Sequence, residues 1–196
     1  MKKLVSLVLA ICMLIGCSVP AYASEISTVY TESVSTAANT ENIVITVHDR
    51  VGSDILAGAN AQDVEILNGL ARATTLPTAY CDLSIQIYLA QMKTIGNSKL
   101  YTNKYFSPDE NNEIHVDFTV YSQDTGTLRV GIYNMNTGAE AYQDFTFTTV
   151  VDETIWFSNL TQGNTYAVYF QSVYNGTNTV YMNGAAQIFY PSVMFG

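Results

Sequence analysis

Three residues with chemically versatile side chains stand at alternate positions of one short stretch. Glu113, His115 and Asp117 recur at every second residue. In an extended strand they project from one face, about 7 Å apart per step. An imidazole flanked by two carboxylates would suit one wall of a metal site. The solvated face of an ordinary strand has the same composition, so the sequence leaves both interpretations open.

Acidic and amide oxygens gather in two expected turns. One spans Asp109–Asn112 and the other contains Asp152 and Glu153. Hard oxygen ligands of this kind suit Ca²⁺, so a structural calcium ion is one hypothesis. Acidic surface turns without any ion are the alternative. The sequence predicts no other cofactor and defines no set of metal ligands.

The motifs of common enzyme classes do not occur in this sequence. It has no Gly-x-Ser-x-Gly elbow, no His-Glu-x-x-His and no glycine-rich phosphate loop. A carboxylate pair for glycoside cleavage cannot be recognised by spacing, because its members would come from different strands. Cys81 has no neighbouring base in the sequence, which predicts a buried and inert thiol. We therefore expect a protein that is not an enzyme.

Aromatic residues give the most specific functional hypothesis. Strand alternation predicts that four of them face away from the core and offer their rings to a ligand, namely Tyr133, Trp156, Tyr169 and Tyr181. Flat rings on an open sheet suit stacking against sugars, with Asn and Gln side chains nearby to bond hydroxyl groups. The alternative is an ordinary sheet surface, because Tyr favours strands. Trp156 would then point inward if the register of its short strand were shifted.

The stretch Glu113–Phe170 must position these side chains. Apolar and polar residues alternate within Ile114–Val120 and again within Leu128–Tyr133, the period of a strand with one dry face. Turn signals at Gln123–Gly126 and Asn134–Gly138 separate these runs. Strands of this kind need a second layer over their apolar faces. The sequence predicts an all-β antiparallel β-sandwich of jelly-roll or fibronectin-III-like type, with about eight strands.

Further segments flank this stretch. Strands are expected at Ile43–Val47, Leu83–Leu89, Lys99–Phe106 and Val180–Ile188. The segment Asp54–Ala73 fits either a helix or an irregular connection, because helical spacing of its apolar residues is interrupted by glycine.

The N-terminus has the pattern of an export signal. Lys2 and Lys3 precede a short apolar run, and Ala21-Tyr22-Ala23 forms a small-x-small cleavage site before Ser24. The run is too short to span a membrane. Alternatively, the Leu-Ile-Gly-Cys sequence that ends at Cys17 resembles a lipobox, which would leave the mature chain lipid-anchored there. Both interpretations place the protein outside the cytoplasm, either secreted or anchored to the cell envelope.

The expected domain plan follows from this cleavage. A signal peptide (1–23) and a flexible leader (24–41) precede an N-terminal strand and connection (42–79) and the sandwich domain (80–196). Removal of 23 of the 196 residues leaves 173, enough for one domain with a sizeable core. Six basic residues then remain against 17 acidic ones, a net charge of −11. Nucleic acid and anionic membranes are poor partners for such a surface, and the mature chain is expected to have no transmembrane segment.

The run Leu160–Tyr166 contains a Leu, a Gly-bearing turn and a Tyr that opens the next strand. It resembles the corner of fibronectin-III-like sandwiches, in which a Tyr hydroxyl bonds back to the crossing loop. Similar turns occur in bacterial pre-peptidase C-terminal domains, whose central strand reads much like Leu128–Asn134. The whole layout, including Arg72–Pro77 and Leu83-Ser84, resembles small secreted Gram-positive proteins of uncharacterised function. These resemblances imply a fold and supply no activity.

Together these features favour a secreted, non-catalytic binding module. Its expected ligand is a glycan or a protein at a cell surface, bound through the exposed aromatic residues. The alternative is a structural or adhesive protein of the cell envelope.

Overall fold

The computed structural model describes residues 28–30, 41–49, 74–173 and 180–194, and these form an all-β protein. The strands are β1 (Thr28–Tyr30), β2 (Val44–Asp49), β3 (Ala79–Tyr80), β4 (Tyr88–Ile95), β5 (Leu100–Tyr101), β6 (Lys104–Tyr105), β7 (Ile114–Ser122), β8 (Gly126–Asn134), β9 (Glu140–Phe147), β10 (Val150–Ser158), β11 (Tyr166–Val173) and β12 (Met182–Phe189). A single helical turn, α3 (Pro191–Met194), follows β12.

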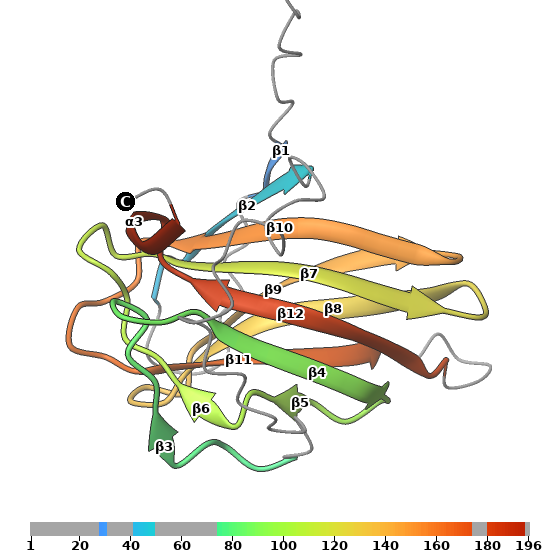
Figure 1. Cartoon of the computed structure of the whole chain (residues 1–196), viewed down its shortest axis with the longest axis horizontal. Coiled ribbons are helices and arrows are strands. Elements are labelled where there is room, and N and C mark those ends of the chain that lie inside the picture. The colour runs from blue at the N-terminus through green and yellow to red at the C-terminus, as the bar shows by residue number, and fades with distance from the viewer. Residues whose placement is uncertain (1–27, 31–40, 50–73, 174–179, 195–196) are drawn as a thin grey trace, which may run out of the picture.

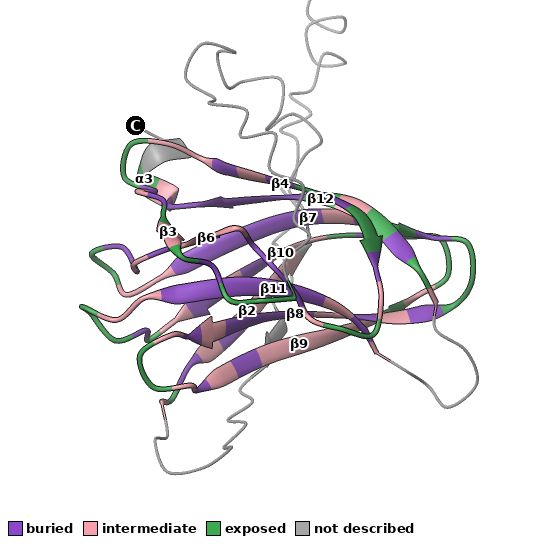
Figure 2. Cartoon of the chain, turned by 90° about the horizontal axis from the view of Figure 1, so that it is seen from below, coloured by how far each residue is buried: buried purple, intermediate pink, exposed green. Residues whose placement is uncertain are grey.

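Two antiparallel sheets make up the body of the molecule (Figure 1). The six-stranded sheet has the order β1-β2-β10-β7-β12-β4, and the four-stranded sheet has the order β5-β11-β8-β9. Viewed from below, β4, β12 and β7 form one layer, while β11, β8 and β9 form the other (Figure 2). The predicted all-β antiparallel sandwich is confirmed.

Strand alternation produces the core between the two sheets. The apolar positions of β7 and β8 that alternate in the sequence are all buried there: Ile114, Val116, Phe118, Val120, Leu128, Val130 and Ile132. Phe118 of the six-stranded sheet meets Phe170 of the four-stranded sheet, with ring centroids 6.4 Å apart. Each fully buried Phe contributes about 2–3 kcal/mol relative to an exposed one. The described residues include one cysteine, Cys81, and therefore no disulfide between two of them, so the described part relies on burial and strand pairing.

The prediction of a strand at Leu83–Leu89 is wrong. The chain forms β4 at Tyr88–Ile95 instead. The Asp82 carboxylate accepts hydrogen bonds from the backbone N–H (3.0 Å) and the hydroxyl (2.7 Å) of Ser84, closing a tight turn before β4. Ile85 is consequently 74% exposed, although the alternation predicted it to face the core.

The single strand predicted from Lys99 to Phe106 is divided into β5 and β6. The Thr102 hydroxyl donates to the Lys104 carbonyl at 2.8 Å and bends the chain between the two halves. As a result β5 pairs with β11, whereas β6 forms a short parallel pair with β3. Tyr101 therefore joins the four-stranded sheet, and Tyr105 lies beside Tyr80 with ring centroids 5.6 Å apart.

The Ile43–Val47 alternation predicts a strand, and the structure contains β2 there, as part of the six-stranded sheet. It pairs in antiparallel register with β10, and Ile43 and Ile45 are buried in the common core. The short β1 falls within the expected leader and pairs along the other edge of β2.

Several predictions lie outside the described residues. They are the export segment with Cys17, the remainder of the leader, the Asp54–Ala73 segment and the turn at Asn175-Gly176.

The crossing from β10 to β11 contains the hydrogen bond that the Leu160–Tyr166 pattern predicts. Tyr166 is fully buried, and its hydroxyl oxygen accepts a hydrogen bond from the Thr161 N–H at 2.8 Å. Gly163 adopts a φ of +84°, a conformation that glycine tolerates best. The same hydroxyl donates to the Glu41 carboxylate, just before β2. The corner therefore ties the crossing loop to the N-terminal strand.

Candidate functional site

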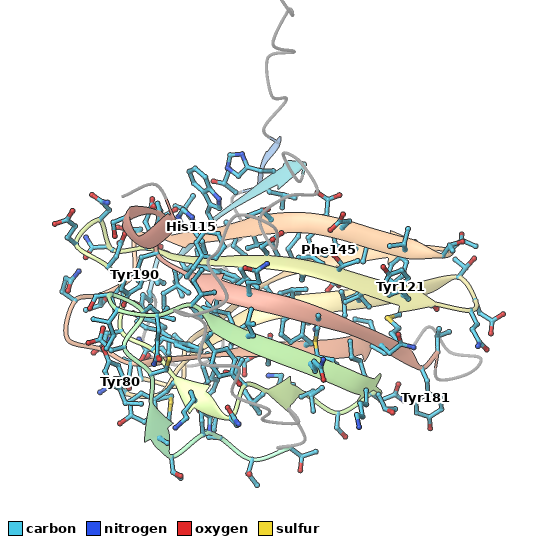
Figure 3. All side chains as sticks on the ribbon, viewed as in Figure 1. Tyr80, His115, Tyr121, Phe145, Tyr181 and Tyr190 are labelled. Carbon is cyan, nitrogen blue, oxygen red and sulfur yellow. The ribbon has the colours of Figure 1, made fainter. Side chains whose placement is uncertain are left out.

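The four aromatic residues predicted to bind a ligand lie on three separate parts of the molecule. Tyr133 (β8) and Tyr169 (β11) are on the outer face of the four-stranded sheet. Trp156 (β10) is on the outer face of the six-stranded sheet. Tyr181 lies at one end of the molecule, just before β12 (Figure 3). The structure brings only the first two together, so the four do not form a single row.

Two further tyrosines join Tyr133 and Tyr169 in a cluster that we call the tyrosine face, comprising Tyr101, Tyr133, Tyr142 and Tyr169. The strand register explains the gathering. Tyr101 pairs with Tyr169, Tyr169 with Gly131, and Gly131 with Tyr142, so β5, β11, β8 and β9 contribute to one cross-strand row. The ring of Tyr101 meets those of Tyr133 and Tyr169 edge-on, at centroid distances of 6.1 and 5.7 Å. This is a favourable arrangement for aromatic pairs.

Gly131 makes room for the central ring of this row. A Cβ atom at Gly131 would lie 2.4 Å from Cζ of Tyr169, so the tip of that ring occupies the space where a side chain would stand. Tyr169 is 0% exposed as a result of its central position. Its ring therefore packs beneath the neighbouring tyrosines. The prediction that Tyr169 offers its ring to a ligand in solvent is wrong. Tyr133 and Tyr142 are half-buried and remain the rings available for stacking.

Two ion pairs lie on the same face. Arg129 donates from Nε and Nη2 to the two carboxylate oxygens of Asp144, both at 2.8 Å, and its guanidinium lies 3.6 Å from the centroid of the Tyr142 ring. Lys99 pairs with Glu140, and its ammonium is 4.7 Å from the centroid of the Tyr169 ring. Cations in these positions are attracted by the aromatic faces and hold the rings in fixed orientations.

Burial and the neighbouring charges shift the pKa values of three residues of this face, Tyr101, Tyr169 and Arg129. Burial, with the charge of Glu140 and the proximity of Tyr133 as lesser causes, raises the pKa of Tyr101 to about 12. Burial likewise raises the pKa of Tyr169. The hydrogen bond to Asp144 raises the pKa of Arg129 despite partial burial. Near neutral pH the hydroxyl groups of Tyr101 and Tyr169 are therefore neutral, and the guanidinium of Arg129 is charged.

Sequence reasoning missed Tyr101, Tyr142 and both ion pairs. The signal that could have found Tyr142 is its position between Ala141 and Gln143, which indicates an outward ring on β9. Strand order, which brings β5 and β9 to either side of β8 and β11, leaves no local trace in the sequence.

Trp156 belongs to a second aromatic group on the other sheet. Its ring stacks on His115 (centroids 4.3 Å apart, 14° between planes) and contacts His48 of β2 (4.1 Å, 36°). Phe189 meets His115 edge-on at 5.7 Å. Both chain neighbours of Trp156 are buried in the core, so its predicted outward direction is confirmed. We call this set the His–Trp stack.

The Glu113, His115 and Asp117 series is used for packing and hydrogen bonding. His115 Nε2 lies 2.9 Å from a Glu113 carboxylate oxygen, and Asp117 accepts a 3.3 Å hydrogen bond from the Thr154 hydroxyl. Among the residues that the structure describes, no three His, Cys, Asp or Glu side chains are arranged to hold a metal ion. The geometry thus gives no support to the metal-site interpretation of this series.

Of the two acidic turns proposed for calcium, Asp109–Asn112 is a turn, but Asp152 and Glu153 lie within strand β10, so the prediction of a second turn is wrong. One oxygen of Asp109 accepts from the N–H groups of Asn111 (2.9 Å) and Glu113 (2.8 Å). Asp152 accepts from the Thr119 hydroxyl at 2.7 Å. These carboxylates shape turns and bridge strands, and a calcium ion at either place stays a hypothesis.

Cys81 is buried, as predicted. Its sulfur accepts a 3.2 Å hydrogen bond from the Gln86 side-chain amide. The turn that follows Asp82 brings these two side chains together.

The described helical residues include no helix with the length and apolar character needed to cross a membrane. In comparisons with known proteins, no family model matches this sequence and no curated protein matches it significantly.

Proposed function

We propose that this chain is a secreted, non-catalytic binding module that recognises a glycan through the tyrosine face. The observation that carries the proposal is the placement of two half-buried rings, Tyr133 and Tyr142, on a rigid sheet beside two ion pairs. Secretion is supported by the export pattern of residues 1–23.

The chemistry of this face suits a neutral sugar. Aromatic rings stack against the C–H groups of a sugar, and a flat strand pair keeps the rings oriented without loss of side-chain entropy on binding. Glu140 and Asp144 offer carboxylate oxygens to sugar hydroxyl groups, and Arg129 offers N–H donors. Each cation is already paired with a carboxylate, so the local charge is balanced. The acidic surface of the whole chain further disfavours anionic ligands.

The change Tyr142→Ala should weaken glycan binding about tenfold, or roughly 1.4 kcal/mol, by removing one stacking ring and the support of Arg129. A glycan array would identify the ligand, and isothermal titration calorimetry would measure the affinity. Tyr133→Ala should have a similar effect. The matched control is Tyr121→Ala, which removes a 52% exposed tyrosine from the other sheet and should leave the affinity unchanged.

Two results would contradict this assignment. Binding that survives both tyrosine changes would exclude the tyrosine face as the site. Loss of binding in Trp156→Ala, with Tyr142→Ala unaffected, would transfer the site to the six-stranded sheet.

A second candidate function, a structural or adhesive protein of the envelope, is favoured by the sheet edges. β4 and β9 are eight-residue strands that each end a sheet in the described part of the chain. Such edges can pair with another chain. An anchored protein should carry an acylated Cys17 as its mature N-terminus, whereas a secreted one should begin at Ser24. Mass spectrometry of the exported protein separates these two results.

A further inference from the structure

The strand β2 occupies a distinctive position in the six-stranded sheet. It pairs with β10 over six registered residues, from Val44 opposite Ser158 to Asp49 opposite Glu153. Its only other strand partner in the described part of the chain is the three-residue β1. By contrast β10 also pairs with β7 and would keep that partner if β2 left. Among the described strands, β2 is therefore joined to the body of the six-stranded sheet through β10 alone.

The N-terminal end of β2 is held by hydrogen bonds to an ionisable side chain, Glu41, and we call this set of bonds the Glu41 latch. The Glu41 carboxylate accepts hydrogen bonds from the Tyr166 hydroxyl, the Asn134 side-chain amide (2.6 Å) and the Thr161 N–H (2.9 Å). All three donors belong to the body of the sandwich. A charged carboxylate accepts such bonds strongly, and a protonated one accepts them far more weakly.

The other end of β2 rests on the His–Trp stack. His48 contacts one side of the Trp156 ring, and His115 of β7 stacks on that ring as well. His115 is 2% exposed, with Phe189 against its edge. Burial disfavours the charged imidazolium even with the Glu113 carboxylate 2.9 Å from Nε2, so protonation of His115 favours displacement of the Trp156 ring that is stacked on it. Movement of Trp156 removes the support beneath His48.

We propose that β2 is an acid-releasable strand, detached from β10 when Glu41 and His115 take up protons at its two ends. Release uncovers the pairing edge of β10 and the core contacts of Ile43 and Ile45. The Glu41 hydrogen bonds and the His–Trp stack both act on one short strand. β2 therefore detaches locally before the rest of the sandwich unfolds.

Protonation of His115 and protonation of Glu41 both weaken the attachment of β2. Burial lowers the pKa of His115, and the hydrogen bond and charge of Glu113 offset this only partly. The neutral imidazole is therefore the folded form, and its contribution is lost as the pH falls below about 6.5. Burial raises the pKa of Glu41, but its hydrogen bonds from Tyr166, Asn134 and Thr161 outweigh that effect and lower it overall. The stabilisation by Glu41 is lost below about pH 4.5.

The charged and ionisable groups around each anchor are few among the described residues. His115 is faced by Glu113 on its own strand segment, by His48 of β2 and, at longer range, by Asp109, while β10 and β12 present uncharged rings. Tyr166 is the only ionisable side chain that bonds Glu41 among the described residues, and its pKa is raised, so it stays a neutral donor.

Hydrogen exchange followed by mass spectrometry tests the proposal on the purified chain. Between about pH 7 and about pH 4, after correction for intrinsic rates, β2 should become about tenfold less protected while β7 and β8 stay protected. Trp156 is the only tryptophan in the chain, so its fluorescence should change over the same range. Unchanged protection of β2, or its loss together with that of β7, would overturn the proposal.

Variants separate the two anchors. His115→Phe keeps a flat ring against Trp156 but cannot titrate. The part of the loss of β2 protection that begins below about pH 6.5 should therefore disappear. Glu41→Gln should open β2 about tenfold more often even near pH 7, because the charged acceptor is gone. Asp124→Asn removes an exposed carboxylate in the turn after β7 and should change nothing. If His115→Phe does not fold, the Glu41→Gln and Asp124→Asn pair still decides, since equal exchange in both would reject the latch.

Discussion

The change Gly184→Ala should destabilise the protein by about 3 kcal/mol, because the new methyl group meets backbone and not a movable side chain. A Cβ atom at this position would lie 2.2 Å from the Thr119 carbonyl oxygen and 2.9 Å from Cα of Val120. Gly184 sits in β12, between β7 and β4, where the register with β4 shifts. Relief of the clash requires two central strands to move apart. Urea denaturation monitored by circular dichroism would measure the lost free energy of unfolding.

Gly96→Ala is the matched control for this experiment. Its added methyl group would meet only the Tyr181 ring, at an ordinary distance of 3.5 Å, so the expected change is within about 0.5 kcal/mol. Equal stability of the two variants would show that β12 does not approach β7 as closely as the structure indicates.

The change Tyr166→Phe should cost about 2 kcal/mol of unfolding free energy. The missing hydroxyl removes one of the two acceptors of the Thr161 N–H and one of the donors to the Glu41 carboxylate. Bonds to charged groups contribute more than neutral ones, which is why the effect exceeds that of an average hydrogen bond. Urea denaturation monitored by circular dichroism would measure this loss of unfolding free energy as well.

Tyr169→Phe gives the appropriate comparison for the corner. It removes a hydroxyl from an equally buried tyrosine on the neighbouring face, but that hydroxyl makes only a 3.4 Å contact with Glu140. We expect a loss below about 1 kcal/mol. A larger loss in Tyr169→Phe than in Tyr166→Phe would contradict the importance assigned to the corner.

The sequence predicted those parts of the fold in which the local period and the final environment agree. The alternation in β7 and β8 identifies the residues that fill the core, and the outward direction of Trp156 follows from the same rule. Leu160–Tyr166 predicted a specific hydrogen bond that the structure contains. In each case a few neighbouring residues decide the conformation.

Predictions were wrong where long-range pairing decides. Leu83–Leu89 alternates at least as regularly as Tyr88–Ile95, but only the latter pairs with β12. Alternation also tells which side of its own sheet a ring occupies without telling which sheet that is. Trp156 and Tyr133 both face outward, on opposite sides of the molecule, for this reason. The partners of Tyr133 on the tyrosine face depend on strand order and could not be read from spacing.

The order of strands also has a consequence for how the chain reaches this structure. Among the described strands, only the pairs β1–β2 and β8–β9 join strands that follow each other directly in the chain, while β7 pairs with β10 and β12. Few contacts can form before distant segments have closed large loops. Such topologies belong to the slow class of single-domain folders, with times of milliseconds to seconds. A chain of this type spends that interval with its apolar strands uncovered, and the edge strands β4 and β9 are then the places most prone to pair with another chain.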